Sequence, residues 1–340
     1  MRHEDPTSHS SAPSPPLLEI RGLDLDFGTP RGRVHALRNI SLNVPAAQVV
    51  GIVGESGSGK STLAYTVMGL LPQNAVVTAG NILFEGRDLL EMPSQTRRNL
   101  LGNRLSMIFQ DPMTALNPVR TIEGQMIDIQ HHEKISRSEK RSLAIQMLHR
   151  VGIPDPQSRM GGYPHHFSGG MRQRICIAMA LLVKPALLIA DEPTTALDAT
   201  LEVQIIHLLK DLQKEIGCSV LFVSHHLGAV AELCDRVAVM YAGEVVEQGG
   251  VRDIFHNPAH PYTRALLECD PGRIRQKTRT LPTIRGEVPN LLGSKEGCIF
   301  QPRCPQAFGR CTQDTPIEYR IGVEQAARCH LLNEKGLVSR

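Results

Sequence analysis

Eight residues from Gly54 to Ser61 have the types and the spacing that bind phosphate groups. They match the pattern G-x-x-x-x-G-K-S/T. Where such a glycine-rich loop opens a helix, several backbone N–H groups point at one anion. Lys60 is then expected to reach the outer phosphates, and the hydroxyl of Ser61 to bind Mg²⁺. The predicted binding set is Gly54, Glu55, Ser56, Gly57, Ser58, Gly59, Lys60, Ser61 and Thr62.

Such a loop needs a strand before it and a helix after it, and the sequence contains both. Residues 48–53 form an apolar, β-branched run that is typical of a buried strand. Residues 62–71 have helical composition and stop at Pro72. A plain glycine-rich turn, the alternative interpretation, leaves these flanks unexplained. The sequence therefore predicts a nucleoside triphosphate site.

Two adjacent carboxylates, Asp191 and Glu192, end an apolar run that begins at Leu187. Ligands and metals gather at the carboxyl ends of strands in open parallel sheets. We expect Asp191 to hold Mg²⁺ through water and Glu192 to orient or deprotonate the attacking water. A solvated acidic turn is the alternative, and the buried strand and upstream phosphate loop disfavour it.

Three further motifs carry polar groups at the ends of predicted elements. Gln110 ends a strand over 105–110, and His225 follows another over 220–223. Ser168, Gly169 and Gly170 open a helix that runs to residue 182, which makes a second anion site. Alone, the glycine pair more often marks a flexible turn, and a histidine at such a position is more often structural.

The segment before the phosphate loop contains one aromatic residue of interest, Phe27. Residues 17–44 read as two strands around a turn at 28–32, with Phe27 just before the turn. A core aromatic and a platform for stacking on adenine are nearly equal interpretations.

Composition bounds the class of protein. The chain has 340 residues, with 41% hydrophobic residues, 21% charged residues and a net charge of +3. This predicts one large domain and a smaller one, with no sign of a nucleic-acid partner. The longest apolar candidate, 178–190, is broken by Lys184-Pro185, so we expect no membrane span. Residues 1–16 predict a disordered tail and not a signal peptide.

Residues 121–151 form a helical block between the phosphate loop and the later strands. Ser138 is a plausible N-cap, and Gly152-Ile153-Pro154 is the expected stop. The sequence thus predicts an α/β protein with helices inserted between the strand ending at Gln110 and the strand beginning at Leu187.

Together these motifs resemble the nucleotide-binding subunit of an ABC transporter over residues 17–255. The shared order is phosphate loop, glutamine loop, helical insertion, Ser-Gly-Gly signature, Asp-Glu strand, Asp loop with Asp198, and histidine loop. The resemblance implies an α/β fold, the ABC-type P-loop nucleotide-binding domain, with an inserted helical subdomain at about 111–183. It also implies that two such subunits face each other head to tail and sandwich two ATP molecules.

The resemblance also implies roles for single residues. Gln110 and Asp191 would join Ser61 in holding Mg²⁺, Glu192 would act on the water, and His225 would contact the γ-phosphate. Ser168, Gly169 and Gly170 would contact the ATP of the partner subunit. Most family members have Asp after the histidine, and here His226 stands in that place. Register alone selects His225 over His226.

The tail, residues 256–340, is expected to be a small C-terminal domain. Segments 256–267, 285–289 and 297–305 are similar to the dipeptide and oligopeptide importer ATPases, although importers of nickel and other small solutes share much of them. The implied partners are a second ATPase of a different chain, two membrane permease subunits and, indirectly, an extracytoplasmic solute-binding protein. The implied location is peripheral, on the cytoplasmic face of the inner or plasma membrane.

Four of the eight cysteines lie in this tail: Cys298, Cys304, Cys311 and Cys329. Zinc ribbons use tight pairs, which these spacings fit poorly. Four thiolates suit an iron–sulfur cluster, and the resemblance points to a 4Fe–4S cluster. Zinc and four ordinary packed thiols are the alternatives.

The sequence is compatible with two alternative functions. The first is the energy-coupling ATPase of a peptide importer, which itself chooses no substrate. The second is a soluble ABC ATPase of translation or DNA repair, without a membrane partner. Such proteins usually carry two cassettes or a long coiled-coil insertion. One phosphate loop and a modest helical insertion favour the importer.

Overall fold

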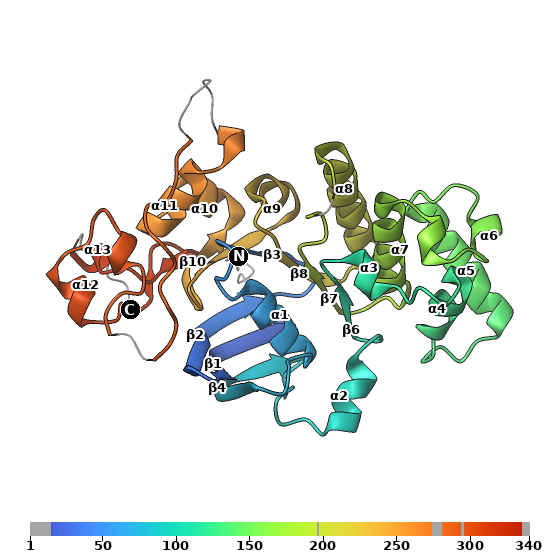
Figure 1. Ribbon diagram of the computed structural model, residues 1–340, viewed down its shortest axis with the longest axis horizontal. Helices are drawn as coiled ribbons and strands as arrows, with labels where there is room; N and C mark the ends of the chain where they lie inside the picture. The colour runs from blue at the N-terminus through green and yellow to red at the C-terminus, as the bar shows by residue number, and fades with distance from the viewer. Residues whose placement is uncertain (1–14, 196, 274–280, 294–295, 335–340) are drawn as a thin grey trace, which may run out of the picture.

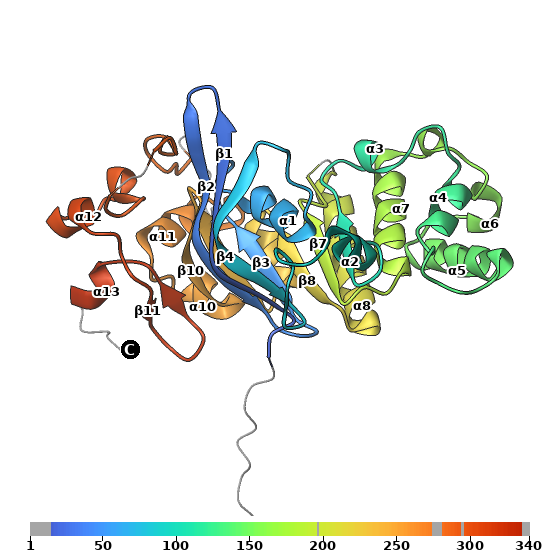
Figure 2. The same ribbon diagram turned by 90° about the horizontal axis from the view of Figure 1, so that it is seen from below.

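A computed structural model describes residues 15–195, 197–273, 281–293 and 296–334. The expected tail over 1–16 lies outside these residues except for its last two positions. In the views of Figures 1 and 2, two sheets occupy the middle of the molecule. Helices α4 to α6 lie at one end, and α12 and α13 lie at the other.

The first half of the chain contains the antiparallel sheet and the phosphate loop. Its elements are β1 (Leu18–Thr29), β2 (Gly32–Val44), β3 (Val49–Val53), α1 (Lys60–Met68), β4 (Ala75–Phe84), β5 (Arg87–Asp88), α2 (Ser94–Leu100), β6 (Leu105–Ile108), α3 (Pro112–Ala115), α4 (Ile122–Asp128), α5 (Arg137–Arg150) and α6 (Pro156–Arg159).

The second half contains most of the larger sheet and the C-terminal segment. Its elements are the 3₁₀ turn η1 (Pro164–His166), α7 (Gly169–Leu182), β7 (Leu187–Asp191), α8 (Ala199–Ile216), β8 (Ser219–Val223), α9 (Leu227–Leu233), β9 (Arg236–Tyr241), β10 (Glu244–Gly250), α10 (Val251–His256), α11 (Pro261–Glu268), η2 (Pro271–Arg273), η3 (Gln301–Arg303), α12 (Gly309–Gln313), β11 (Tyr319–Arg320), β12 (Ala326–Ala327) and α13 (Leu331–Glu334).

The larger sheet has the strand order β11-β12-β10-β9-β3-β8-β7-β6. Its five strands from β9 to β6 are parallel, so their carboxyl ends meet at one edge. The short strands β12 and β11 of the C-terminal segment extend the sheet antiparallel beyond β10. The smaller sheet, β2-β1-β4-β5, is antiparallel.

Strand β3 is buried on both faces, as its continuous apolar sequence predicts. Val50 and Ile52 join the core between the two sheets, which also contains residues of α1. Val49 and Val53 join the core beneath the helices of the other face. The strand that leads into the phosphate loop is therefore held from both sides.

The helical block expected over 121–151 is two helices, α4 and α5, and both pack in the same core as α7. The N-cap of α5 is Ser136, where Ser138 was expected. None of the helices in the described ranges has the length and apolarity needed to cross a bilayer.

Candidate functional site

The phosphate loop runs from the end of β3 to the first turn of α1, and its glycines are required by its path. Gly54 has φ 153°, and a Cβ atom there would lie 2.1 Å from the carbonyl oxygen of Met240. Gly59 has φ 100° and lies against the carbonyl of Ala36. Positive φ and such close approach exclude other residues. The backbones of β9 and β2 therefore restrict the path that the loop can take.

Lys60 folds back across this loop. Its Nζ donates hydrogen bonds of 2.9 Å to the carbonyl oxygens of Gly54 and Glu55, and lies 3.5 Å from Oγ of Ser58. Burial lowers the pKa of this ammonium group, while the nearby carboxylates of Glu192 and Asp191 act to raise it. A cation is therefore positioned inside the curve of the loop.

Ser61 and Asp191 form an oxygen pair beside the loop. Oγ of Ser61 donates to Oδ1 of Asp191 at 2.9 Å. Asp191 ends β7 and is completely buried, and its Oδ2 has no hydrogen-bond partner among the described residues. Burial raises the pKa of the Asp191 carboxyl. A hydroxyl and a carboxylate with an unused oxygen are the donor types that Mg²⁺ prefers, so these residues fit that ion.

Glu192 lies where the ends of three neighbouring strands, β6, β7 and β8, come together. Its Oε2 accepts hydrogen bonds from Nε2 of Gln110 at 3.0 Å and from Oγ1 of Thr195 at 2.9 Å. Its Oε1 lies 3.2 Å from Nδ1 of His225. Although burial acts to raise it, the pKa of Glu192 lies below its usual value because of the hydrogen bonds from Thr195 and His225. Gln110, Glu192 and His225, which follow β6, β7 and β8, are therefore brought together.

His226 meets a different carboxylate, although its ring packs against the edge of His225 with 4.2 Å between ring centroids. Its Nδ1 lies 2.6 Å from Oε1 of Glu202 in α8, which also accepts a hydrogen bond from Oγ1 of Thr194. The geometry thus puts His225, and not His226, beside Glu192. Sequence reasoning missed Thr195 and Glu202, because a threonine or glutamate on its own carries no signal of the side chain that it meets.

The other predicted residues are not joined to this cluster by any hydrogen bond in the described structure. Ser168 is the N-cap of α7 and accepts from the N–H of Met171. Asp198 is the N-cap of α8 and accepts from the N–H groups of two residues, Thr200 and Leu201. Phe27 lies in β1, is half-buried and packs against the core between the sheets.

The predicted metal cluster in the tail is wrong. All four cysteines are described, yet no group of three or more His, Cys, Asp or Glu residues in the described ranges could hold a metal ion. Burial raises the pKa of Cys298 to about 12 and that of Cys329 to about 11, and the neighbouring cysteines add to both shifts. In the described structure all four are free thiols. The structure therefore supports packed thiols.

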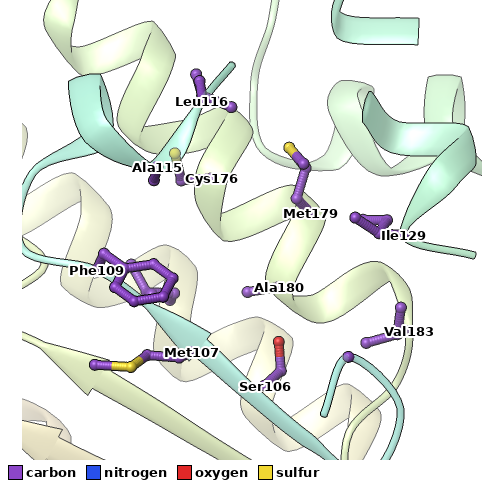
Figure 3. A pocket seen from close by; sticks show the side chains of 12 residues that line it. Ser106, Met107, Phe109, Ala115, Leu116, Ile129, Cys176, Met179, Ala180 and Val183 are labelled. Carbon is purple, nitrogen blue, oxygen red and sulfur yellow. The ribbon is translucent and has the colours of Figure 1, made fainter. Parts of the chain in front are cut away.

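An apolar pocket of about 180 Å³ lies between the end of β6 and the helix α7 (Figure 3). Phe109, directly before Gln110, lines one side, and Cys176, Met179 and Ala180 of α7 line another. The pocket is therefore bounded by the end of the strand that leads to Gln110 and by the helix that begins after Ser168.

Two protein families match this chain. The ABC transporter family matches residues 37–195, and the family described as oligopeptide/dipeptide transporter, C-terminal region, matches residues 246–311. The oligopeptide transport ATP-binding protein of Salmonella typhimurium is 46% identical over 91% of this chain and 92% of its own length. The dipeptide transport ATP-binding protein of Haemophilus influenzae is 45% identical over 94% of this chain and 97% of its own length.

Among solved structures, the fold matches a dimeric ATP-binding cassette in a post-hydrolysis state with bound ADP and Pi. The TM-score is 0.62 at 26% sequence identity, and the match covers 69% of this chain and 99% of that chain.

Proposed function

Because this chain belongs to the family of ABC transporter ATP-binding proteins, we propose that it is the ATP-hydrolysing, energy-coupling subunit of a peptide importer. One observation carries the proposal. The phosphate loop, the Ser61–Asp191 pair and the cluster around Glu192 meet at the carboxyl edge of one parallel sheet. The names of the relatives, an oligopeptide and a dipeptide transport protein, supply the substrate class.

The loop from Gly54 to Thr62 would hold the phosphates of ATP. Lys60 already lies inside the loop on two carbonyl oxygens, and phosphate oxygens would compete for its ammonium group. Ser61 and Asp191, with the side-chain oxygen of Gln110, would hold Mg²⁺. When bound, that ion supplies positive charge against the charge that develops on the phosphates.

Glu192 is the group that would accept the proton of the attacking water. Its lowered pKa keeps it ionised at neutral pH, as a base must be. Gln110 and Thr195 hold one of its oxygens, and His225 faces the other. This arrangement fixes the direction of the carboxylate, and His225 would also contact the γ-phosphate.

Ser168, Gly169, Gly170 and Asp198 would act in a second subunit's site. The N-terminus of α7 carries Ser168 as its cap and two glycines whose N–H groups suit an anion. The related cassette was solved as a dimer with ADP and Pi, which supports a pair of subunits; the head-to-tail arrangement is what the family resemblance implies. We propose that the second subunit is a different ATPase chain.

The wider assembly follows from the same relatives. We propose two membrane permease subunits as partners, a solute-binding protein outside the membrane, and a peripheral position at the cytoplasmic membrane face. In this proposal residues 17–255 are the ATPase domain, with the helical subdomain at about 111–183. Residues 256–340 form the domain typical of peptide importers.

Two variants test the ATPase. Lys60→Ala should lower ATP binding and reduce the hydrolysis rate roughly 10²–10³-fold, because one preorganised charge is lost. Glu192→Gln should keep ATP binding and stop hydrolysis, because an amide accepts no proton. A fluorescent ATP analogue and a phosphate-release assay measure both. Exposed Glu91 gives the matched control, Glu91→Gln, with wild-type rates. Wild-type turnover in Glu192→Gln would contradict the assignment.

Transport distinguishes the importer from its alternatives. Reconstituted with its permease subunits in vesicles, the wild type should drive ATP-dependent uptake of labelled dipeptides, and the Glu192→Gln variant should not. Uptake of nickel without peptide uptake would indicate a small-solute importer. ATP hydrolysis with no membrane-associated partner would favour a soluble ATPase.

A further inference from the structure

Glu55, the second residue of the phosphate loop, has all of its polar groups engaged. Its carbonyl oxygen accepts from Nζ of Lys60 at 2.9 Å. Its N–H donates to the hydroxyl of Tyr262 at 2.9 Å. Its carboxylate binds the guanidinium of Arg303. Two of these three partners come from beyond β10, at sequence separations of 207 and 248 residues.

The contact between Arg303 and Glu55 is bidentate. Nη1 donates to Oε2 at 2.7 Å, and Nη2 donates to Oε1 at 3.0 Å. The Arg303 side chain is 4% exposed and the Glu55 side chain 27%. Two parallel charge-assisted bonds in a largely buried place fix direction as well as distance.

Arg303 is itself held from behind. Its Nε donates to the carbonyl of Arg285 at 2.9 Å, and its Nη2 donates to the carbonyl of Ile284 at 3.0 Å. Its Nη1 also lies 3.4 Å from the hydroxyl of Tyr241 in β9. A side chain with so many partners cannot follow Glu55 if the loop moves. It therefore constrains the loop.

Tyr262 is equally immobile. It is fully buried, with ring centroids 4.6 Å from Tyr241 and 5.3 Å from Phe300. Its hydroxyl therefore marks one fixed point for the N–H of Glu55. Figure 1 shows α11, which carries Tyr262, on the same side of the molecule as the C-terminal segment.

We propose that Tyr262 and Arg303 form a C-terminal clamp on Glu55, which positions the phosphate loop and its Lys60 for ATP. The clamp residues touch no substrate and are positioning residues. The proposal rests on the proposed function, since it assumes that the loop binds ATP. It makes the nucleotide affinity of this chain depend on a segment outside the part that matches the ABC transporter family, residues 37–195.

The test is a double-mutant cycle on ATP binding with Glu55→Gln, Arg303→Gln and the double variant. Each single change should raise the Kd of a fluorescent ATP analogue about tenfold, within the range usual for coupled sites. The double variant should bind no more weakly than either single variant, because both remove the same contact. Arg303→Lys, which keeps the charge and loses the bidentate geometry, should fall between wild type and Arg303→Gln.

Arg310 gives the matched control. It lies in the same segment and pairs with Asp314 in an exposed contact, so Arg310→Gln should leave the Kd unchanged. Thermal unfolding of every variant separates folding from positioning. If Arg303→Gln does not fold, Glu55→Gln and Tyr262→Phe carry the test. The first changes the loop side of the contact with Arg303, and the second removes the hydroxyl that meets the N–H of Glu55.

Three outcomes would overturn the clamp. The first is an unchanged Kd in Arg303→Gln with a lowered unfolding temperature, which would make the pair structural only. The second is additive effects in the double variant. The third is an equal loss of affinity in Arg310→Gln. A wild-type protein that binds no ATP would instead refute the proposed function, so the two failures are distinguishable.

Discussion

Asp191 and Glu192 are neighbours with different surroundings, and a backbone turn separates them. Adjacent side chains of a strand point to opposite faces. Glu192 has φ 45°, the left-handed region, so the strand ends at Asp191 and the next side chain is redirected. Asp191 stays with Ser61, while Glu192 meets Gln110 and His225. The sequence predicts two roles here, and the turn makes them possible.

The variant Asp191→Asn tests whether the carboxylate of Asp191 helps to hold Mg²⁺. The amide keeps the size and an oxygen for Ser61, but removes the negative charge that Mg²⁺ favours. The Mg²⁺ concentration for half-maximal ATP hydrolysis should rise at least about tenfold, as for lost metal contacts generally. A Mg²⁺ titration at saturating ATP measures it, with exposed Asp128→Asn as the control. An unchanged titration would contradict the role of Asp191.

His226 shows why a single position is hard to interpret without neighbours. The sequence marks it only as a departure from the Asp of most family members. The structure gives it a partner, Glu202, 24 residues earlier in the chain. An Asp at that position would place a second carboxylate beside Glu202, so the histidine and the glutamate suit each other.

The residue at which α5 begins can be predicted from the sequence. Ser136 and Glu139 have the S-x-x-E spacing of a capping box, and the structure contains both of its hydrogen bonds. Ser138 has Arg141 three residues later, so no such box can form there. Helical composition extends over the whole of 121–151, so composition does not mark the break between α4 and α5.

The N-cap of α11 predicts a pH effect. His260 is fully buried, and burial lowers its pKa to about 3 from 6.5. Its Nδ1 accepts from the N–H of Tyr262, which needs the neutral ring. In the unfolded chain the same histidine takes up a proton below about pH 6.5. The unfolded state then binds more protons, so stability is present above pH 6.5 and is lost as pH falls towards 3.

His260→Asn should flatten this dependence, because asparagine caps a helix and does not titrate. Between pH 7 and pH 5 the wild type should lose about 2 kcal/mol more unfolding free energy than the variant, at ~1.4 kcal/mol per pH unit below pH 6.5. Urea unfolding at the two pH values measures the difference. Equal losses in both proteins would show that His260 is not the group that titrates.

For the whole molecule, the order of motifs predicts the nucleotide-binding fold well, because four of the motifs lie at the ends of strands of the same parallel sheet, β3, β6, β7 and β8. The structure of the tail, residues 256–340, is harder to predict from the sequence. Its cysteine spacing and resemblance suggested a metal cluster, although spacing alone cannot say which sulfur atoms become buried as thiols. Nor does any local pattern show that Arg303 meets Glu55, since that contact exists only after the sheet has formed.

Phe300 tests whether the tail folds with the rest. It is 1% exposed, belongs to the large core beneath the helices, and contacts Tyr241 and Tyr262. Phe300→Ala should therefore cost about 3–5 kcal/mol of unfolding free energy and shift the unfolding of the whole chain as one transition. On heating, the circular dichroism signal of the folded chain and the ATPase activity should be lost in the same transition. Partly exposed Phe308→Ala is the matched control, with a smaller loss. Separate transitions would mean that the tail unfolds alone.

The distance along the chain between Glu55 and Arg303 has a consequence for synthesis. A ribosome adds about 5–20 residues per second, so the 248 residues between them take roughly 12–50 seconds to make. For the first 207 of these residues the nascent phosphate loop has neither Tyr262 nor Arg303, and for an earlier part of that time β3 also lacks its neighbours β8 and β9. If the proposed clamp positions the loop, the nucleotide site is complete only after Arg303 has been added, 248 residues after Glu55.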